Sequence, residues 1–246
     1  PAHQLLAFQY TLQKNYQDAL IQTEIVLNLG GEARPDSLAI GSQQLPEKDK
    51  LEILALYQEF YSRHPENNEI GYSLALVQRN LKQFNEALQT LNPILKRNPE
   101  FEAAVVLKVN LLYDLGQLKE ALELADDQYD NFPANHNLGR LFASMLIEDK
   151  QLDKAESVFE DLVALYPQAP SLKLSYALVM LENNKVEPSR IELLELLEAG
   201  VHQNEANFYL GRIADQNKTF PEAIKYYQQV KRSNHFEPSI ERASFL

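Results

Sequence analysis

Apolar residues recur every three or four positions along this chain, in runs separated by short polar breaks. The clearest example is the stretch 102–133, which divides into two runs at residues 103–115 and 118–132. A period of three to four residues is that of an amphipathic helix. Gly116 lies between the runs, and glycine suits the end of a helix because φ is often positive there. The pattern predicts a pair of helices joined by a turn near Gly116.

The same pattern repeats every 34 residues. One column of the repeat holds alanine, at Ala19, Ala87, Ala121, Ala155 and Ala223. A second column holds proline, at Pro65, Pro99, Pro133 and Pro167. The alanines let two helix backbones approach closely, and each proline ends the second helix of its pair. One pair is too small to bury its apolar face alone, so neighbouring pairs should stack.

A third column holds a bulky residue followed by a small one, as in Leu74-Ala75, Phe142-Ala143 and Leu210-Gly211. This order of bulky, small, alanine and proline positions resembles the tetratricopeptide repeat, or TPR. The resemblance implies an all-α fold, a right-handed superhelical solenoid of about seven helix-turn-helix repeats. Residues 34–50 fit least, because Pro46 would end a helix early and Lys50 occupies an apolar position.

The repeat predicts one continuous array without separate domains. Its boundaries are 1–33, 34–67, 68–101, 102–135, 136–169, 170–203 and 204–237, with a truncated eighth repeat at 238–246. Stand-alone solenoids usually carry polar capping helices, and neither end of this chain shows one. We therefore expect a fragment of a longer protein. Alternatively, the uncapped ends of two copies of the chain associate with each other.

Residues suited to catalysis or to holding a cofactor or metal are sparse. The chain has no cysteine, which excludes disulfides, thiolate zinc sites and a cysteine nucleophile. Its histidines, at His3, His64, His136, His202 and His235, form no i, i+4 pair. We expect no catalytic residue, no cofactor and no metal site, and therefore no enzyme.

Charge and hydropathy narrow the class of partner. The formal net charge of −12 leaves no basic footprint for nucleic acid. No run of about 18 apolar residues occurs, so we expect no membrane-spanning segment. A protein or peptide remains as the expected partner.

In TPR superhelices the first helix of each repeat lines a concave groove, and the resemblance carries this role to matching positions here. The candidate groove residues are Tyr72, Arg79, Asn110, Tyr113, Arg140, Leu174, Leu178, Phe208 and Arg212. Tyrosine and arginine are enriched at binding hot spots, and an exposed leucine stripe marks an interaction surface. The alternative is that the aromatic residues serve packing and that the leucines of repeat 170–203 belong to the core. The lysine and asparagine clamp by which some TPR domains hold a carboxyl terminus is not assembled, because Val106 and Ser144 replace two of its residues.

Residues 69–77 and 208–214 are similar to TPR outer-membrane lipoproteins of gammaproteobacteria, which include adaptors of a periplasmic carboxyl-terminal processing protease. This resemblance implies a periplasmic scaffold anchored through a segment outside this chain; without it, a cytoplasmic scaffold is expected. The sequence predicts a non-enzymatic scaffold or adaptor that binds a partner in its groove. The alternative is a structural or oligomerisation segment with no groove of its own.

Overall fold

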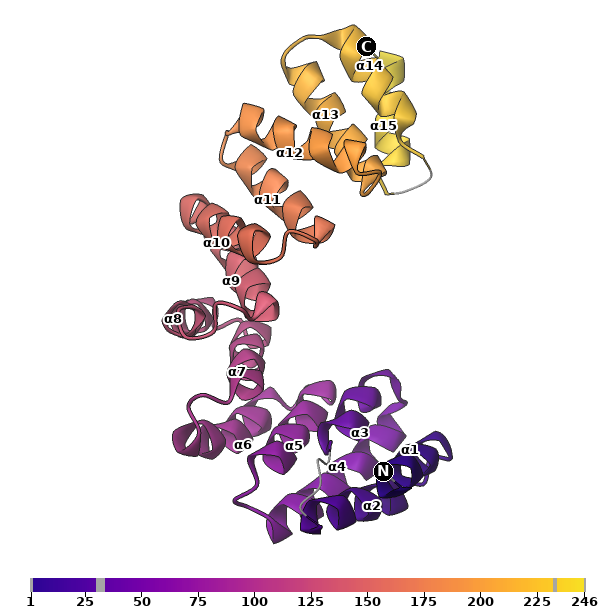
Figure 1. Cartoon of the computed structure of the whole chain (residues 1–246), viewed down its shortest axis with the longest axis vertical. Helices are drawn as coiled ribbons and strands as arrows, with labels where there is room; N and C mark the ends of the chain where they lie inside the picture. Colours follow the sequence, from indigo (N-terminus) through magenta and orange to yellow (C-terminus); the bar gives the residue numbers. More distant parts are fainter. Residues whose placement is uncertain (1, 30–33, 232–233, 246) are drawn as a thin grey trace. The chain divides into compact units, whose positions relative to one another are not determined.

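The computed structural model describes residues 2–29, 34–231 and 234–245, and the regular structure of these residues is helical throughout. The predicted repeat limits at residues 1, 33 and 246 lie outside them. The chain divides into two compact units, Pro1–Leu124 and Ala125–Leu246 (Figure 1).

The N-terminal unit contains three full helix pairs and the start of a fourth. Its elements are α1 (Ala2–Leu12), α2 (Tyr16–Asn28), α3 (Asp36–Gly41), the 3₁₀ helix η1 (Ser42–Gln44), α4 (Glu47–Arg63), α5 (Asn68–Asn80), α6 (Phe84–Arg97) and α7 (Glu102–Asp114). Helix α8 (Leu118–Tyr129) begins in this unit and ends in the next. Helices α1 and α2 pack on each other, as do α5 and α6, while α4 packs on α5 and α6 packs on α7.

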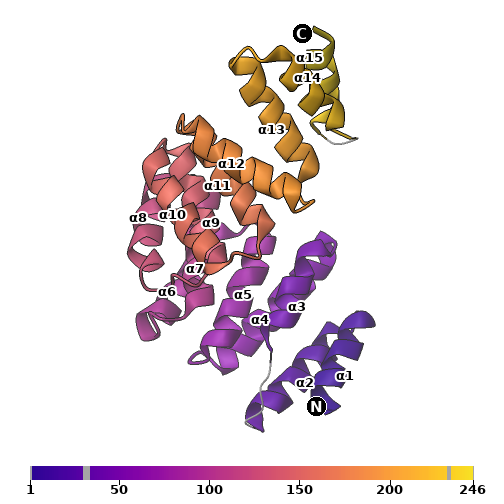
Figure 2. The same ribbon diagram turned by 45° about the horizontal axis from the view of Figure 1, so that its top comes forward.

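The C-terminal unit continues the same arrangement. Its helices are α9 (His136–Glu148), α10 (Leu152–Leu165), α11 (Pro170–Glu182), α12 (Val186–Glu198), α13 (Gln203–Gln216), α14 (Phe220–Gln229) and α15 (Phe236–Phe245). Helices α13, α14 and α15 lie side by side in both ribbon views (Figures 1 and 2).

The helices follow the predicted phase. Helices α5, α7, α9 and α11 begin at residues 68, 102, 136 and 170, which are the predicted starts of four successive repeats. The alanine column is buried throughout, with exposed fractions of 0 to 2%. A different position of the repeat also needs a small residue, since a Cβ on Gly139 would lie 2.9 Å from Leu162 Cδ2. The predicted all-α solenoid of helix pairs is confirmed.

The turn inside each repeat except the second places one residue in the left-handed region. Gly116 has φ of 75°, as its position between two helical runs predicted. The same slot in other repeats holds non-glycine residues with φ from 58° to 63°, namely Lys14, Lys82, Lys150, Asn184 and Lys218. The geometry of the turn is thus common to these repeats, although among them only Gly116 is a glycine, the residue type that predicts it.

The second repeat departs from the others where the sequence indicated. Its first helix, α3, has six residues and continues into η1, after which Leu45 is extended, with ψ of 157°. A residue before proline is pushed out of the helical region, so Pro46 accounts for this break. Lys50 lies within the long helix α4, half-buried, and its Nζ donates to the Asn80 carbonyl at 3.5 Å.

Candidate functional site

The described residues hold neither a metal-binding cluster nor a helix that could span a membrane. Across residues 2–29, 34–231 and 234–245, no three His, Asp or Glu side chains are grouped so as to hold a metal ion. In the same ranges, no helix has both the length and the apolar character needed to cross a bilayer. A candidate site must therefore be sought among surfaces and cavities.

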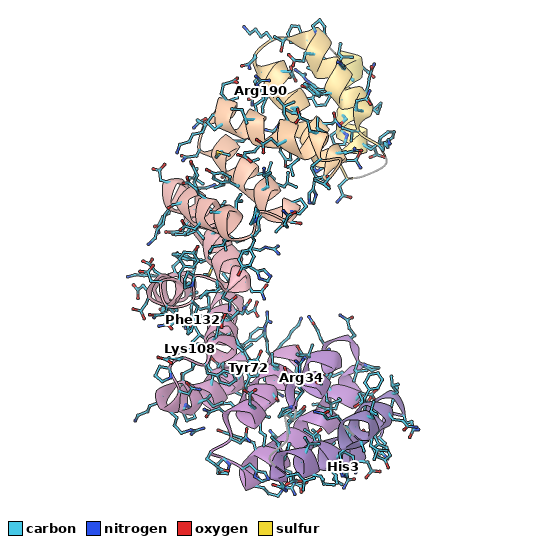
Figure 3. The ribbon with its side chains drawn as sticks, viewed as in Figure 1. His3, Arg34, Tyr72, Lys108, Phe132 and Arg190 are labelled. Atoms are coloured by element: carbon cyan, nitrogen blue, oxygen red, sulfur yellow. The ribbon has the colours of Figure 1, made fainter. Side chains whose placement is uncertain are left out.

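In the N-terminal unit, the predicted groove residues Tyr72, Arg79 and Asn110 make contacts inside the unit. Tyr72 is half-buried on α5 (Figure 3), and its ring centroid lies 5.4 Å from that of Phe101. Burial raises the pKa of its hydroxyl. Arg79 Nε donates to Asp114 Oδ2 at 3.1 Å. The Asn110 side chain donates to the Val106 carbonyl of its own helix at 2.8 Å.

The remaining predicted residue of this unit, Tyr113, is 39% exposed near the end of α7. Since Arg79 is already paired with a carboxylate, its charge is partly neutralised by the unit itself. The structure therefore leaves less free binding capacity in this unit than the residue types alone indicated.

In the C-terminal unit the predicted residues separate into two groups. Arg140 is exposed on α9, Leu174 packs against a core that contains Leu193 and Leu196, and Phe208 stacks on His235 with ring centroids 4.4 Å apart. Leu178 and Arg212 instead line one cavity. These two are the predicted site residues that the structure brings together.

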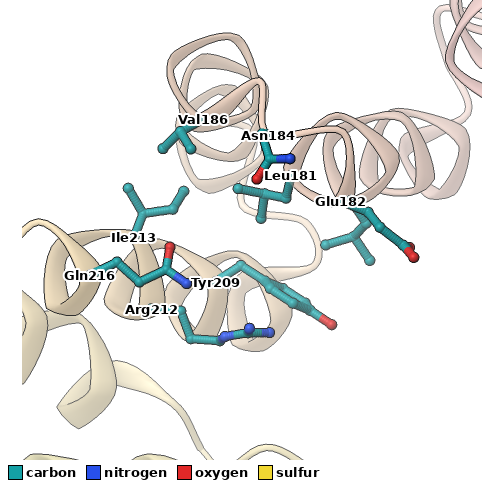
Figure 4. A pocket seen from close by; sticks show the side chains of 9 residues that line it. Leu181, Glu182, Asn184, Val186, Tyr209, Arg212, Ile213 and Gln216 are labelled. Atoms are coloured by element: carbon teal, nitrogen blue, oxygen red, sulfur yellow. The ribbon is translucent and has the colours of Figure 1, made fainter. Parts of the chain in front are cut away.

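This cavity has a volume of about 460 Å³ and lies against α11, the start of α12, and α13 (Figure 4). Its lining residues are Leu178, Leu181, Glu182, Asn184, Val186, Tyr209, Arg212, Ile213 and Gln216. We call it the α11–α13 cavity. Figure 4 shows Tyr209, Arg212 and Gln216 projecting from one helix, with Leu181, Glu182 and Val186 on the other side.

Helical spacing explains how one cavity receives so many side chains. On α11, Leu178, Leu181 and Glu182 are three to four residues apart and share a face. On α13, Tyr209, Arg212 and Gln216 do the same. Two first helices of adjacent repeats thus present parallel rows, and the turn between α11 and α12 adds Asn184 with its φ of 59°.

The charged side chains at and near the cavity differ in whether they already form an ion pair. Glu182 Oε1 accepts from Lys150 Nζ at 3.0 Å. On the same helix as Arg212, Asp215 is held by Arg242 through two bonds of 2.5 and 2.9 Å, and this pairing lowers the pKa of Asp215. Arg212 has its Cζ 5.7 Å from the Tyr209 ring centroid, and no ion pair forms to it from the part of the chain that the structure describes.

Sequence reasoning missed several lining residues. Tyr209 belongs to the repeat signature and not to the expected groove positions, and Asn184 lies in a turn, outside the first-helix positions that the resemblance marks. The available signal for Asn184 was its alignment with Gly116, since both occupy the left-handed slot of their repeats. For Tyr209, the available signal was its position three residues before Arg212, which places both side chains on one face of a helix.

Comparison with known proteins places the fold in a family. The model described as "Tetratricopeptide repeat" matches residues 190–238, and the model described as "Anaphase-promoting complex, cyclosome, subunit 3" matches residues 52–128. The curated TPR repeat-containing protein YpiA of Bacillus subtilis (strain 168) is 23% identical over 162 residues, which cover 66% of this chain. The chain spans 37% of the length of that relative.

Solved structures agree on the fold at low sequence identity. YrrB, described as a TPR protein with an unusual peptide-binding site, is 13% identical with a TM-score of 0.64, over 77% of this chain and 98% of its own. PilF of Pseudomonas aeruginosa is 16% identical with a TM-score of 0.63, over 80% and 89%. A tetratricopeptide repeat protein from Parabacteroides merdae is 14% identical with a TM-score of 0.55, over 99% and 98%. The two family models match parts of this chain, and these solved structures share its tetratricopeptide repeat fold.

Proposed function

We propose that this chain is a non-enzymatic scaffold that binds an extended segment of a partner protein along the first helices of its repeats. The TPR fold itself supports a role in protein–protein interaction. The observation that carries the narrower proposal is the α11–α13 cavity, where apolar side chains and several polar groups line open space. Ligand sites commonly combine an apolar cavity with a few convergent polar groups.

Within the C-terminal unit, Arg140, Leu174 and Phe208 belong to this proposal as flanking contacts. On the N-terminal unit, Tyr72, Arg79, Asn110 and Tyr113 are proposed as a separate set of groove contacts. A peptide is the class of ligand that the comparison with YrrB also favours, because that protein is described as having a peptide-binding site.

Selection of random peptides displayed on phage tests the proposal. We expect the immobilised 246-residue chain to enrich peptides, and Leu178→Asp to abolish the enrichment because it places a charge on the apolar wall. Ile191→Asp is the matched control, since Ile191 is 54% exposed on α12 and does not line the cavity. Circular dichroism checks that both variants fold. Equal enrichment by wild type and Leu178→Asp would contradict the proposed site.

A narrower version of the proposal concerns the partner. The similarity of residues 69–77 and 208–214 to lipoprotein adaptors supports a role in presenting substrates to a periplasmic carboxyl-terminal processing protease. Co-purification of that protease with the full-length protein tests this version. Its absence after chemical crosslinking in intact cells would remove the adaptor role and leave the scaffold role standing.

A structural role is the second candidate, and α1 favours it. None of its residues is buried, and Leu5, Phe8 and Leu12 have exposed fractions of 70%, 64% and 69%. Exposed apolar surface of this kind often covers an interface. If α1 mediates self-association, sedimentation will show a mass that rises with concentration, and Leu5→Glu with Leu12→Glu will restore the monomer. A constant monomer mass at all concentrations would exclude this candidate.

A further inference from the structure

The α11–α13 cavity combines an apolar interior with one uncompensated positive charge. Its apolar lining comes from Leu178, Leu181, Val186 and Ile213. The volume of about 460 Å³ lies within the range of ligand pockets, roughly 300–1,000 Å³. A large aliphatic or aromatic side chain of a peptide would therefore find both room and apolar contact there.

The positive charge of Arg212 at the rim of the cavity indicates that the ligand carries a negative charge beside its apolar side chain. Arg212 lies over the face of Tyr209, a contact that uses none of its N–H donors. Those donors have the fork geometry that matches a carboxylate. The neighbouring carboxylates of Glu182 and Asp215 are already bound by Lys150 and Arg242.

Two amide side chains at the cavity add capacity for backbone groups. Asn184 and Gln216 both line it, and neither side-chain amide makes a hydrogen bond within the described ranges 2–29, 34–231 and 234–245. Each amide offers two donors and an acceptor. A peptide backbone that becomes buried requires such partners for its N–H and C=O groups.

Alternative ligand charges fit less well. A basic side chain would meet Arg212 and would have to displace Lys150 from Glu182. A nucleic acid would bring a row of phosphates to a single free arginine, on a chain of net charge −12. An acidic peptide uses the free charge and leaves both existing ion pairs intact.

We propose that the α11–α13 cavity recognises an extended peptide segment in which an apolar side chain lies next to a carboxylate. The apolar side chain enters between Leu178, Leu181 and Ile213, and the carboxylate pairs with Arg212. Asn184 and Gln216 bind the backbone of the segment. This inference rests on the proposed peptide-binding role and adds the chemistry of the ligand to it.

The peptide selection described above tests this inference when its sequences are read. We expect the wild-type pool to be enriched in an apolar residue beside Asp or Glu. Arg212→Glu, which reverses the charge at an exposed position, is expected to replace the acidic residue by Lys or Arg in its own pool. Lys225→Gln on α14 is the control, because it also removes an exposed positive charge but does not line the cavity.

Fluorescence anisotropy then measures the preference with defined probes. Two fluorescein-labelled peptides that differ only in Leu-Glu against Leu-Gln are the probes, and we expect the Gln peptide to bind about two- to fivefold more weakly to the wild type. The difference should shrink as NaCl is raised, because a rim ion pair is screened. Arg212→Glu should abolish or invert it, and Lys225→Gln should preserve it.

The outcomes separate this inference from the function on which it rests. If peptides are enriched without acidic residues, or if Arg212→Glu selects the same sequences as the wild type, the inference is wrong while peptide binding stands. If the folded wild type enriches no peptide at all, both are wrong. Gln216→Ala provides a milder second variant, for which weaker binding of both probes is expected.

Discussion

Gly41 and Gly211 occupy the same slot of their repeats and have opposite surroundings. Gly211 is buried on α13, and a Cβ there would lie 2.7 Å from two ring carbons of Tyr227 on α14. Gly41 is exposed at the end of α3, and an added Cβ would meet nothing within 4 Å. The period of the sequence thus identifies equivalent positions without fixing what packs against them.

The cause of the difference is the length of the first helix. Helix α13 has 14 residues and lies along α14, so its small residue permits close contact. Helix α3 has six residues before the chain turns through η1 toward Pro46. A cavity of about 640 Å³ lies beside α3, against α1 and α2, and Gly41 is part of its lining. In the second repeat, where α3 is short, the position of Gly41 therefore faces an open cavity. In the repeat of α13, the same position is packed against the next helix.

The largest effect is expected from Gly211→Ala. The added methyl group must displace the ring of Tyr227, which is 2% exposed and has little room to move. Overpacking of this kind costs about 1–3 kcal/mol of folding free energy. Urea unfolding followed by circular dichroism measures the loss. An unchanged midpoint would mean that the two helices separate easily, which would remove the contrast with Gly41.

The matched substitution Gly41→Ala should have the opposite sign. Gly41 has φ of −59°, a helical value, and no neighbour that a methyl group would strike. Alanine restricts the unfolded chain more than glycine does, so the free energy of unfolding should rise by up to about 1 kcal/mol. The same urea titration reports it. Destabilisation here would show that the surroundings of α3 are as tight as those of α13.

A smaller pair of opposite effects is expected in the turn slot. Lys82 has φ of 61°, so Lys82→Gly should relieve left-handed strain and stabilise the fold by less than about 1 kcal/mol. Lys48 occupies the corresponding position of the second repeat but lies inside α4. There Lys48→Gly should cost roughly 0.5 kcal/mol, because glycine weakens a helix. Thermal unfolding of the two variants should move in opposite directions, and shifts of the same sign would contradict the assignment of the slots.

The smallest effect on stability is expected when the pH is lowered. Arg242 lowers the pKa of Asp215, so this pair stabilises the fold at neutral pH, above the usual aspartate value of about 4. The contribution is lost as the pH falls below that value and through the lowered pKa. In the second repeat the corresponding position holds Leu45, which cannot form such a pair. Asp215→Asn should therefore reduce the difference in thermal midpoint between pH 7 and pH 3, and an identical pH profile in both proteins would contradict the role of the pair.

Much of the fold could be predicted from local pattern. The starts of α5, α7, α9 and α11, the left-handed turn at Gly116 and the break at Pro46 all follow from residues close together in sequence. The candidate site was harder to predict from the sequence, because its residues come from different helices. Leu178 and Arg212 line one cavity although 34 residues separate them, while Arg79 and Asn110 were chosen by the same rule and make contacts inside their own unit.

The sequence by itself therefore determined the period, the helix pairs and the small residues between them, since each depends on backbone preference and apolar spacing. Tertiary structure alone decided which polar side chains remain free to bind. Asp114 takes up Arg79, Arg242 takes up Asp215, and Arg212 keeps its donors free above Tyr209. The physical reason is that an ion pair depends on a distance of a few ångströms between side chains of adjoining helices. A repeating sequence pattern places such side chains in register, but the packing of each layer sets the distance.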